Sequence, residues 1–215
     1  MTKTLNQGYE STPEEAEFEL RAHIGSIWSG GRLFIGMYTF LIASLVFAYF
    51  YLRSANNGLL WRPHHVTAPT HYGWVVMLAT VATGLMAVVG RRRLRGGSVL
   101  DWQVAGWTGL ITGVIALIVQ IWELSSLPFY PGSSGYASTF IGFGVFNIMT
   151  LVVVIFWVET TLARSLRLRR ELGAPGLLST SAVAQSWRAN VAAMTYFAGF
   201  AAVSGAFLFL MFYQM

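Results

Sequence analysis

The chain has 215 residues, of which 55% are hydrophobic and 11% are charged. A soluble core of ordinary proportions cannot bury that much apolar surface, so lipid must surround most of this chain. The net charge of +5 comes from basic residues in short clusters between long uncharged segments, a pattern of membrane topology and not of nucleic-acid binding. The lack of cysteine excludes disulfides, cysteine-ligated iron–sulfur clusters and a catalytic thiol.

The first 32 residues are rich in glutamate, unlike the basic start and apolar middle of a secretory signal. Within them, Thr12, Pro13 and Glu15 predict the start of a helix, with an N-cap, a proline in the first turn and a capping-box glutamate. Apolar side chains then recur at roughly helical spacing between charged ones. We expect residues 1–32 to form a cytoplasmic segment with a short amphipathic helix in the membrane interface, a partly ordered tail being the alternative.

Five segments approach the roughly 20 apolar residues that a helix needs to cross a bilayer. They are residues 33–52, 73–90, 102–122, 137–158 and 189–213. The predicted fold class is therefore an all-α integral membrane protein, a five-transmembrane-helix bundle whose membrane domain covers residues 33–215. A turn is expected at residues 173–176, where glycine and proline interrupt the last cytoplasmic loop.

The distribution of Lys and Arg between alternate loops predicts the orientation of the bundle. Twelve basic residues lie on one side and only two, Arg53 and Arg62, on the other. The twelve are Lys3, Arg21, Arg32, Arg91, Arg92, Arg93, Arg95, Arg164, Arg167, Arg169, Arg170 and Arg188. Since basic loops stay inside, the amino terminus is expected in the cytoplasm and the carboxyl terminus outside it.

The interiors of the five segments hold no histidine, Asp, Glu, Lys or Arg. A b-type haem held between helices requires histidines at bilayer depth, and proton or ion carriers place ionisable groups near the midplane. His64, His65 and His71 share one external loop, where we interpret them as interfacial histidines, with a surface metal site as the alternative. We therefore expect no catalytic residue, cofactor site or metal site in this chain.

Two further patterns concern packing and lipid. Gly106, Gly109 and Gly113 line one face of the third span, which predicts close helix packing, a ligand groove being the alternative. Four arginines end the second span and are candidates for binding anionic lipid headgroups, with a role in topology alone as the alternative. The four are Arg91, Arg92, Arg93 and Arg95.

The connection between the third and fourth spans carries the most specific motif of the chain, over residues 120–140. Its defining residues are Gln120, Glu123, Pro128, Phe129, Tyr136, Ser138 and Thr139. The motif resembles subunit III of the haem-copper oxidases, which joins two helices by a Gln-x-x-Glu, Pro-Phe and Tyr-Gly-Ser-Thr-Phe run. Residues 36–44 are similar to the Gly-Met-x-x-Phe-x-x-Ser-Glu helix of that family, and five spans match its short bacterial form. The resemblance covers residues 33–213.

Three parts of the sequence depart from the family pattern. Ser44 stands where the family commonly has an acidic residue, and Asn190 where a histidine is usual near the start of the last helix. The family's Gly-Phe-His-Gly-x-His run corresponds to residues 142–147, which contain neither histidine and end at Asn147. These differences predict a divergent branch of the same fold, in which Glu123 keeps its matched position.

The resemblance implies a non-catalytic subunit of a respiratory terminal oxidase in the bacterial cytoplasmic membrane. Such a chain packs beside catalytic subunit I and the other oxidase subunits, binds phospholipid, and supports proton uptake during O2 reduction. The haem and copper, and the oxidation of cytochrome c or quinol, belong to the partner subunits. An accessory subunit of a nitric oxide reductase is a close alternative. A small membrane transporter is a more distant one, against which the lack of proline in the spans counts.

Glu123 is expected to have a structural role. It ends the third span shortly before Pro128 and Phe129. A carboxylate there can accept hydrogen bonds from backbone N–H groups of the following loop, or from the start of the fourth helix near Ser138 and Thr139. Its loss would then loosen the connection between the two helices.

Overall fold

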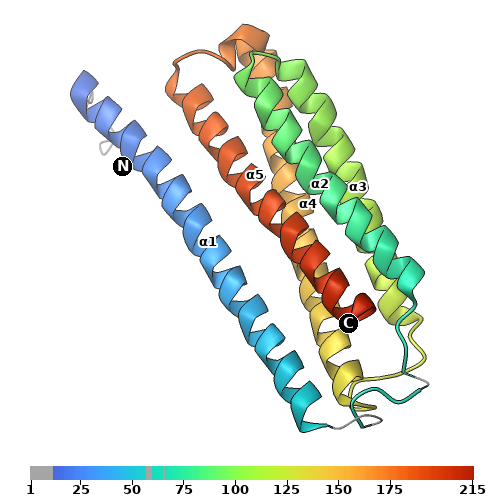
Figure 1. Ribbon diagram of the computed structural model, residues 1–215. Helices are drawn as coiled ribbons and strands as arrows, with labels where there is room; N and C mark the ends of the chain where they lie inside the picture. The colour runs from blue at the N-terminus through green and yellow to red at the C-terminus, as the bar shows by residue number, and fades with distance from the viewer. Residues whose placement is uncertain (1–11, 57–59, 65) are drawn as a thin grey trace, which may run out of the picture.

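The computed structural model describes residues 12–56, 60–64 and 66–215, which form five helices long and apolar enough to cross a membrane (Figure 1). They are α1 (Pro13–Ala55), α2 (Thr70–Arg95), α3 (Val99–Ser125), α4 (Gly135–Gly176) and α5 (Ala182–Phe209), the last continued by a π-helix, η2 (Leu210–Gln214). No strand occurs in these described ranges. The prediction of an all-helical chain with five helices of transmembrane length is confirmed.

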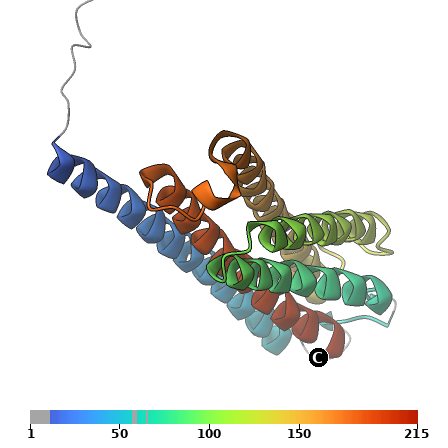
Figure 2. The same ribbon diagram turned by 90° about the horizontal axis from the view of Figure 1, so that it is seen from above.

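Four of the helices form a closed ring. Helix α2 packs against α3 and α5, and α4 closes the ring by packing against the same two helices. Helix α1 lies outside the ring, against α5 and less extensively against α4 (Figures 1 and 2). Only 11% of the most apolar stretch of α1 is buried, which leaves most of this helix to face lipid or a protein partner.

Helix α1 begins where the sequence predicts. The backbone N–H of Thr12 donates to Glu15 Oε2 at 2.8 Å, and the N–H of Glu15 donates to Thr12 Oγ1 at 3.3 Å, so the capping box is formed. The expected short interfacial helix is, however, not a separate element, because α1 continues unbroken to Ala55. No proline follows Pro13 in this helix, and each glycine between residues 25 and 36 costs only about 1 kcal/mol.

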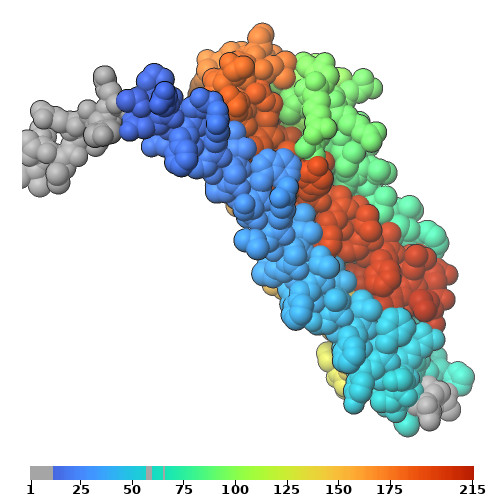
Figure 3. Space-filling view, turned by 60° about the vertical axis from the view of Figure 1, so that its left-hand side comes forward, coloured from blue at the N-terminus to red at the C-terminus, as the bar shows by residue number. Residues whose placement is uncertain are grey.

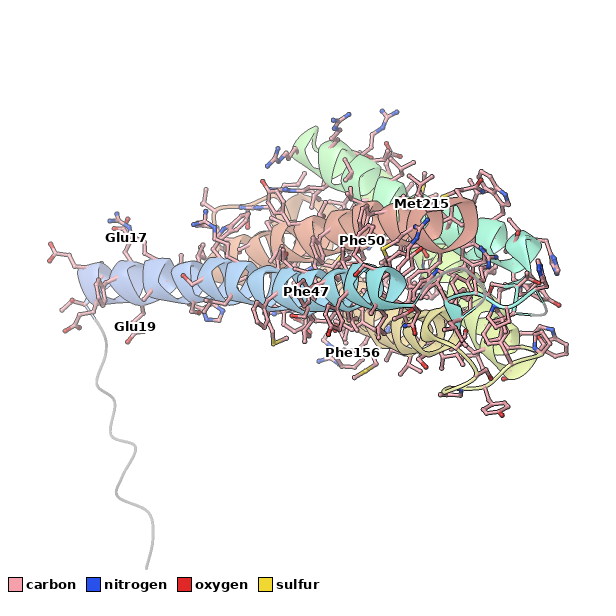
Figure 4. The ribbon with its side chains drawn as sticks, turned by 60° about the horizontal axis from the view of Figure 1, so that its bottom comes forward. Glu17, Glu19, Phe47, Phe50, Phe156 and Met215 are labelled. Carbon is pink, nitrogen blue, oxygen red and sulfur yellow. The ribbon has the colours of Figure 1, made fainter. Side chains whose placement is uncertain are left out.

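The amino-terminal part of α1 extends beyond the neighbouring helices. Figure 4 shows Glu17 and Glu19 near the end of α1 that projects past the rest of the bundle. Arg21 Nη2 contacts Glu17 Oε1 at 2.5 Å on this exposed surface. This segment is therefore polar and solvated, whereas the remainder of α1 is apolar.

The arginine-rich ends of the helices lie together. The connections from α2 to α3 and from α4 to α5 lie at the same end of the bundle as the start of α1 (Figure 1). Near the second connection, the backbone of α4 is kinked at Gly173, whose φ of +72° favours glycine, but the helix continues to Gly176. The turn predicted at residues 173–176 therefore lies slightly later, at Leu177 and Leu178. The assignment of this end to the cytoplasm stays a prediction.

Glycines permit the closest helix contacts. A Cβ placed on Gly106 or Gly113 of α3 would lie 3.2 or 3.1 Å from side chains of α4, so this seam packs against neighbours as predicted. One of the closest helix approaches, which the sequence did not identify, is at Gly84 of α2. A Cβ there would lie 2.6 Å from Ala202 Cβ and 2.8 Å from the Ala198 carbonyl oxygen of α5. Helices α2 and α5 can meet here only because position 84 has no side chain.

Candidate functional site

Glu123 occupies the last full turn of α3 and is completely buried. It belongs to an inward-facing stripe of α3 that includes Gly113, Ala116 and Gln120, residues spaced three or four apart and therefore on one helix face. Gln120 lies one turn before Glu123, so their side chains meet. The helical spacing therefore places the Glu123 carboxyl group and the Gln120 amide side by side, at one end of the bundle.

A chain of hydrogen bonds passes through these two residues. Gln120 Nε2 donates to Glu123 Oε2 at 2.8 Å, and the hydroxyl of Tyr213 donates to Glu123 Oε1. On the other side, Asn147 Nδ2 of α4 donates to Gln120 Oε1 at 2.8 Å. The network therefore joins α4, α3 and the π-helical end of α5.

The carboxyl group receives only neutral donors. Among the residues that the structure describes, the one ion pair is between Arg21 and Glu17, far along the chain from Glu123. Burial of an ionised carboxylate without a cation is costly, and the hydroxyl and amide donors lower that cost. A carboxyl group in such surroundings can anchor helix ends, and it can also hold a proton.

A cavity of about 50 Å³ lies beside the network. Its polar lining comes from Thr80, Gln120, Asn147 and Tyr213, and aromatic side chains of α4 and α5 form much of the remainder. The volume exceeds the ~10–15 Å³ that one water molecule requires, and the polar lining offers hydrogen-bond partners. The cavity beside the network therefore has room for a small number of water molecules.

Two tyrosines complete the carboxyl-terminal end of the bundle. The last carbonyl groups of a helix have no partner within the helix. Tyr136 of α4 donates its hydroxyl to the Phe212 carbonyl at 2.9 Å, and Tyr49 of α1 donates to the Met211 carbonyl at 3.2 Å. Both tyrosines are at most 1% exposed. The family-like Tyr136 thus binds the same element, η2, that brings Tyr213 to Glu123.

The partners expected for Glu123 are wrong. The Ser138 hydroxyl accepts from the Gly132 N–H, and the Thr139 hydroxyl donates to backbone carbonyls of its own helix. Neither residue contributes a hydrogen bond to the carboxyl group. The reason is that the side chain of Glu123 points into the bundle, toward residues that are distant in sequence, and away from the loop that follows it.

The rest of the family-like motif divides between core and surface. Phe129 is buried, and its ring lies 6.4 Å from that of Tyr136 and 6.0 Å from that of Phe140. Pro128 and Ser138 are exposed. Among the buried members, Gln120 and Glu123 form the hydrogen-bond network, and Phe129 and Tyr136 belong to an aromatic cluster. Thr139 is also buried, but its hydroxyl donates only to carbonyls of its own helix.

The positions that depart from the family pattern have different surroundings. Ser44 is exposed and donates only to the Phe40 carbonyl of its own helix. Asn190 accepts from Trp157 Nε1 at 3.1 Å and donates to the Thr161 hydroxyl at 3.3 Å. It lies in the first half of α5, whereas Glu123 contacts Tyr213 beyond the end of that helix. Asn147 is the one departure that enters the Glu123 network.

Sequence reasoning missed Asn147 and Tyr213 as members of the site. A usable signal existed for Asn147, because an amide within an apolar span must find a hydrogen-bond partner inside the bundle. No comparable signal marks Tyr213, since a tyrosine at a span end is typical of interfacial anchoring. Its contact with Glu123 joins residues 90 positions apart and depends on the π-helical turn of η2.

Two of the three histidines within residues 64–71 lie in the described part of the chain. His64 and His71 are exposed, and the ring of His71 lies 4.0 Å from that of Tyr72. His65 lies outside the described residues. No group of three His, Cys, Asp or Glu side chains suitable for a metal ion occurs among residues 12–56, 60–64 and 66–215.

Comparison with known proteins does not extend this description. No protein-family model matches the chain, and no match to it is found among curated proteins. The function must therefore be argued from the site and from the sequence motif that builds it.

Proposed function

We propose that this chain is a non-catalytic subunit of a respiratory haem-copper oxidase, equivalent to subunit III. In this role it stabilises the catalytic subunit, binds phospholipid and supports proton uptake during O2 reduction. The oxygen chemistry takes place at the haem and copper of the partner. The proposal places the chain in the bacterial cytoplasmic membrane, with its amino terminus inside.

The observation that carries the proposal is that residues of the family-like motif meet at one end of the bundle, around η2. Glu123 of α3 and Tyr136 of α4 each form a hydrogen bond with η2 at the carboxyl-terminal end of α5, and Gln120 supports this junction by donating to Glu123. A family-like motif that builds one helix junction accounts for this arrangement better than a chance match of three residues. Asn147 takes the place of a family histidine and still supplies a hydrogen-bond donor to the junction.

Two features support an accessory role. The site has a buried carboxyl group and neutral donors but, in the described residues, no nucleophile paired with a base. Helix α1 presents a mostly uncovered apolar surface, with Phe47 72% exposed and Phe40 73% exposed. A surface of this kind, on a helix outside the ring, suits a partner protein in the membrane.

The test is purification of the native complex through an affinity tag on this chain. The expected result is co-purification of a catalytic oxidase subunit, with haem and copper spectra and O2 reduction in the eluate. Recovery of nitric oxide reductase subunits would assign the chain to the alternative complex. Recovery of this chain without any redox subunit, from membranes solubilised in mild detergent, would contradict the proposal.

A further inference from the structure

The basic end of α2 adjoins an apolar groove that lies apart from the Glu123 network. The groove, of about 550 Å³, lies between α2 and α5. Arg91, Arg92 and Arg95 line it on α2, and Tyr196, Gly199 and Val203 are among its lining residues on α5. Because a helix rises 1.5 Å per residue, the α5 wall descends roughly 10 Å from Tyr196 to Val203. The groove thus begins at charged side chains and continues along apolar ones.

Tyr196 also borders a second groove, on the other side of α5. This groove, of about 270 Å³, lies between α1 and α5, and Trp28 and Arg32 are part of its lining. The Trp28 ring meets the Tyr196 ring edge-on at 5.5 Å, and the Arg91 guanidinium lies over the Tyr196 ring at 4.8 Å. Figure 3 shows α1, α5 and the green end of α2 on one face of the molecule. Tyr196 therefore stands between two grooves, each with arginine at its border.

The positive charge of the arginines in this region is not neutralised by acidic side chains of the described residues. The two groove linings contain four arginines and no acidic side chain. None of these arginines forms an ion pair within residues 12–56, 60–64 and 66–215. Arginine binds phosphate oxygens through several N–H donors, and its apolar stem covers neighbouring hydrophobic surface. A ligand with an anionic head and apolar chains satisfies both properties of the region.

We propose that this region binds an anionic glycerophospholipid of the adjoining leaflet. Its phosphate lies beside Tyr196, where Arg91 and Arg95 hold it from α2 and Arg32 from α1. One acyl chain occupies the α2–α5 groove and the other the α1–α5 groove. A soluble anion would use only the arginines and leave both apolar grooves without a partner. The inference deepens the lipid-binding part of the proposed function and rests on that proposal only for the place of the chain in a membrane.

Two features of the groove provide matched controls. Arg93 belongs to the same basic cluster as Arg95 and is equally exposed, but it does not line the groove. Gly199 lies in the groove wall, and a Cβ added there meets nothing within 4 Å, so a larger side chain at this position can extend into the groove. Gly142 of α4 is open in the same way and lies outside both grooves.

The experiment is native mass spectrometry of the full-length chain, stripped of lipid in detergent and titrated with phosphatidylglycerol or phosphatidylcholine. We expect one phosphatidylglycerol to bind more tightly than phosphatidylcholine. Arg95→Gln should weaken phosphatidylglycerol binding about fivefold, the contribution of one basic residue near an anionic headgroup, and Arg93→Gln should change it far less. Gly199→Leu should weaken binding of both lipids, whereas Gly142→Leu should not. Circular dichroism of each variant checks that the helices are intact.

Three results would overturn the inference. One is equal affinity for the two lipids, and another is an equal effect of Arg93→Gln and Arg95→Gln, since general surface charge would explain it. The third is unchanged binding in folded Gly199→Leu. Because binding is measured on the chain alone, these results do not depend on which redox subunits co-purify with it. A failure of the oxidase proposal is thereby distinguished from a failure of the lipid site.

Discussion

Replacement of Glu123 by alanine measures how much the buried carboxyl group contributes to the bundle. The substitution removes the acceptor of the Gln120 amide and of the Tyr213 hydroxyl, both of which lie in a buried environment. Each orphaned donor costs about 1–3 kcal/mol, so Glu123→Ala should lower the free energy of unfolding by about 2–6 kcal/mol. The cavity left behind adds to this loss.

The Glu123→Gln variant should have a smaller effect. Glutamine keeps one carbonyl oxygen for the Gln120 amide, and its own amide can donate to the Tyr213 hydroxyl, which acts as donor or acceptor. What is lost is the charge assistance of the hydrogen bonds, which contributes up to about 1.5–3 kcal/mol. In the purified complex we expect modestly lower retention of the subunit and unchanged turnover per assembled complex.

Unfolding in mixed micelles with increasing SDS, followed by far-UV circular dichroism, provides the measurement. Glu159→Ala is the matched control, because Glu159 is an exposed glutamate on α4. Combining Glu123→Ala with Tyr213→Phe should give a coupling free energy of about 0.5–3 kcal/mol, as for residues in one hydrogen-bond network.

Two outcomes would refute this reasoning. If Glu123→Ala destabilises the chain no more than Glu159→Ala, the buried network does not hold the helix ends together. If a Glu123→Gln complex retains all subunits but has lost turnover, the carboxyl group takes part directly in proton movement, and the structural interpretation fails.

Three further predictions concern other parts of the chain. Gly84→Ala should destabilise the bundle by about 1–3 kcal/mol in the same unfolding assay, because its Cβ would meet the α5 backbone, whereas Gly142→Ala should be neutral or stabilising. Tyr136→Phe leaves the buried Phe212 carbonyl without its donor and should cost about 1–3 kcal/mol; an unchanged unfolding midpoint would contradict this role. A fluorescent reporter that matures only in the cytoplasm should stay dark when fused after Met215, and bright cells would reverse the predicted orientation.

Patterns among neighbouring residues were sufficient to predict the five helices and the start of α1. The length of the apolar runs required helices, because a backbone in lipid must satisfy its own hydrogen bonds. The side chains of Thr12 and Glu15 form their capping box with backbone groups only three residues away. This pattern can therefore be recognised without knowledge of the tertiary structure. The seam at Gly106 and Gly113 was likewise visible as helical spacing of small residues. These features depend on neighbours in the sequence.

Other features depend on which helices become neighbours, and only the tertiary structure decided them. Sequence identified Glu123 as the notable carboxyl group but placed its partners in the adjacent loop, whereas they include Tyr213 at the far end of the chain. In the same way, the sequence marks Arg91 as a candidate for binding a lipid headgroup or as a topology signal, but only the fold places the Tyr196 ring of α5 beneath its guanidinium. Hydrophobic segments of equal length can pack in many orders with similar burial. The steric fit at positions such as Gly84, and the need of buried polar groups for partners, select one order among them.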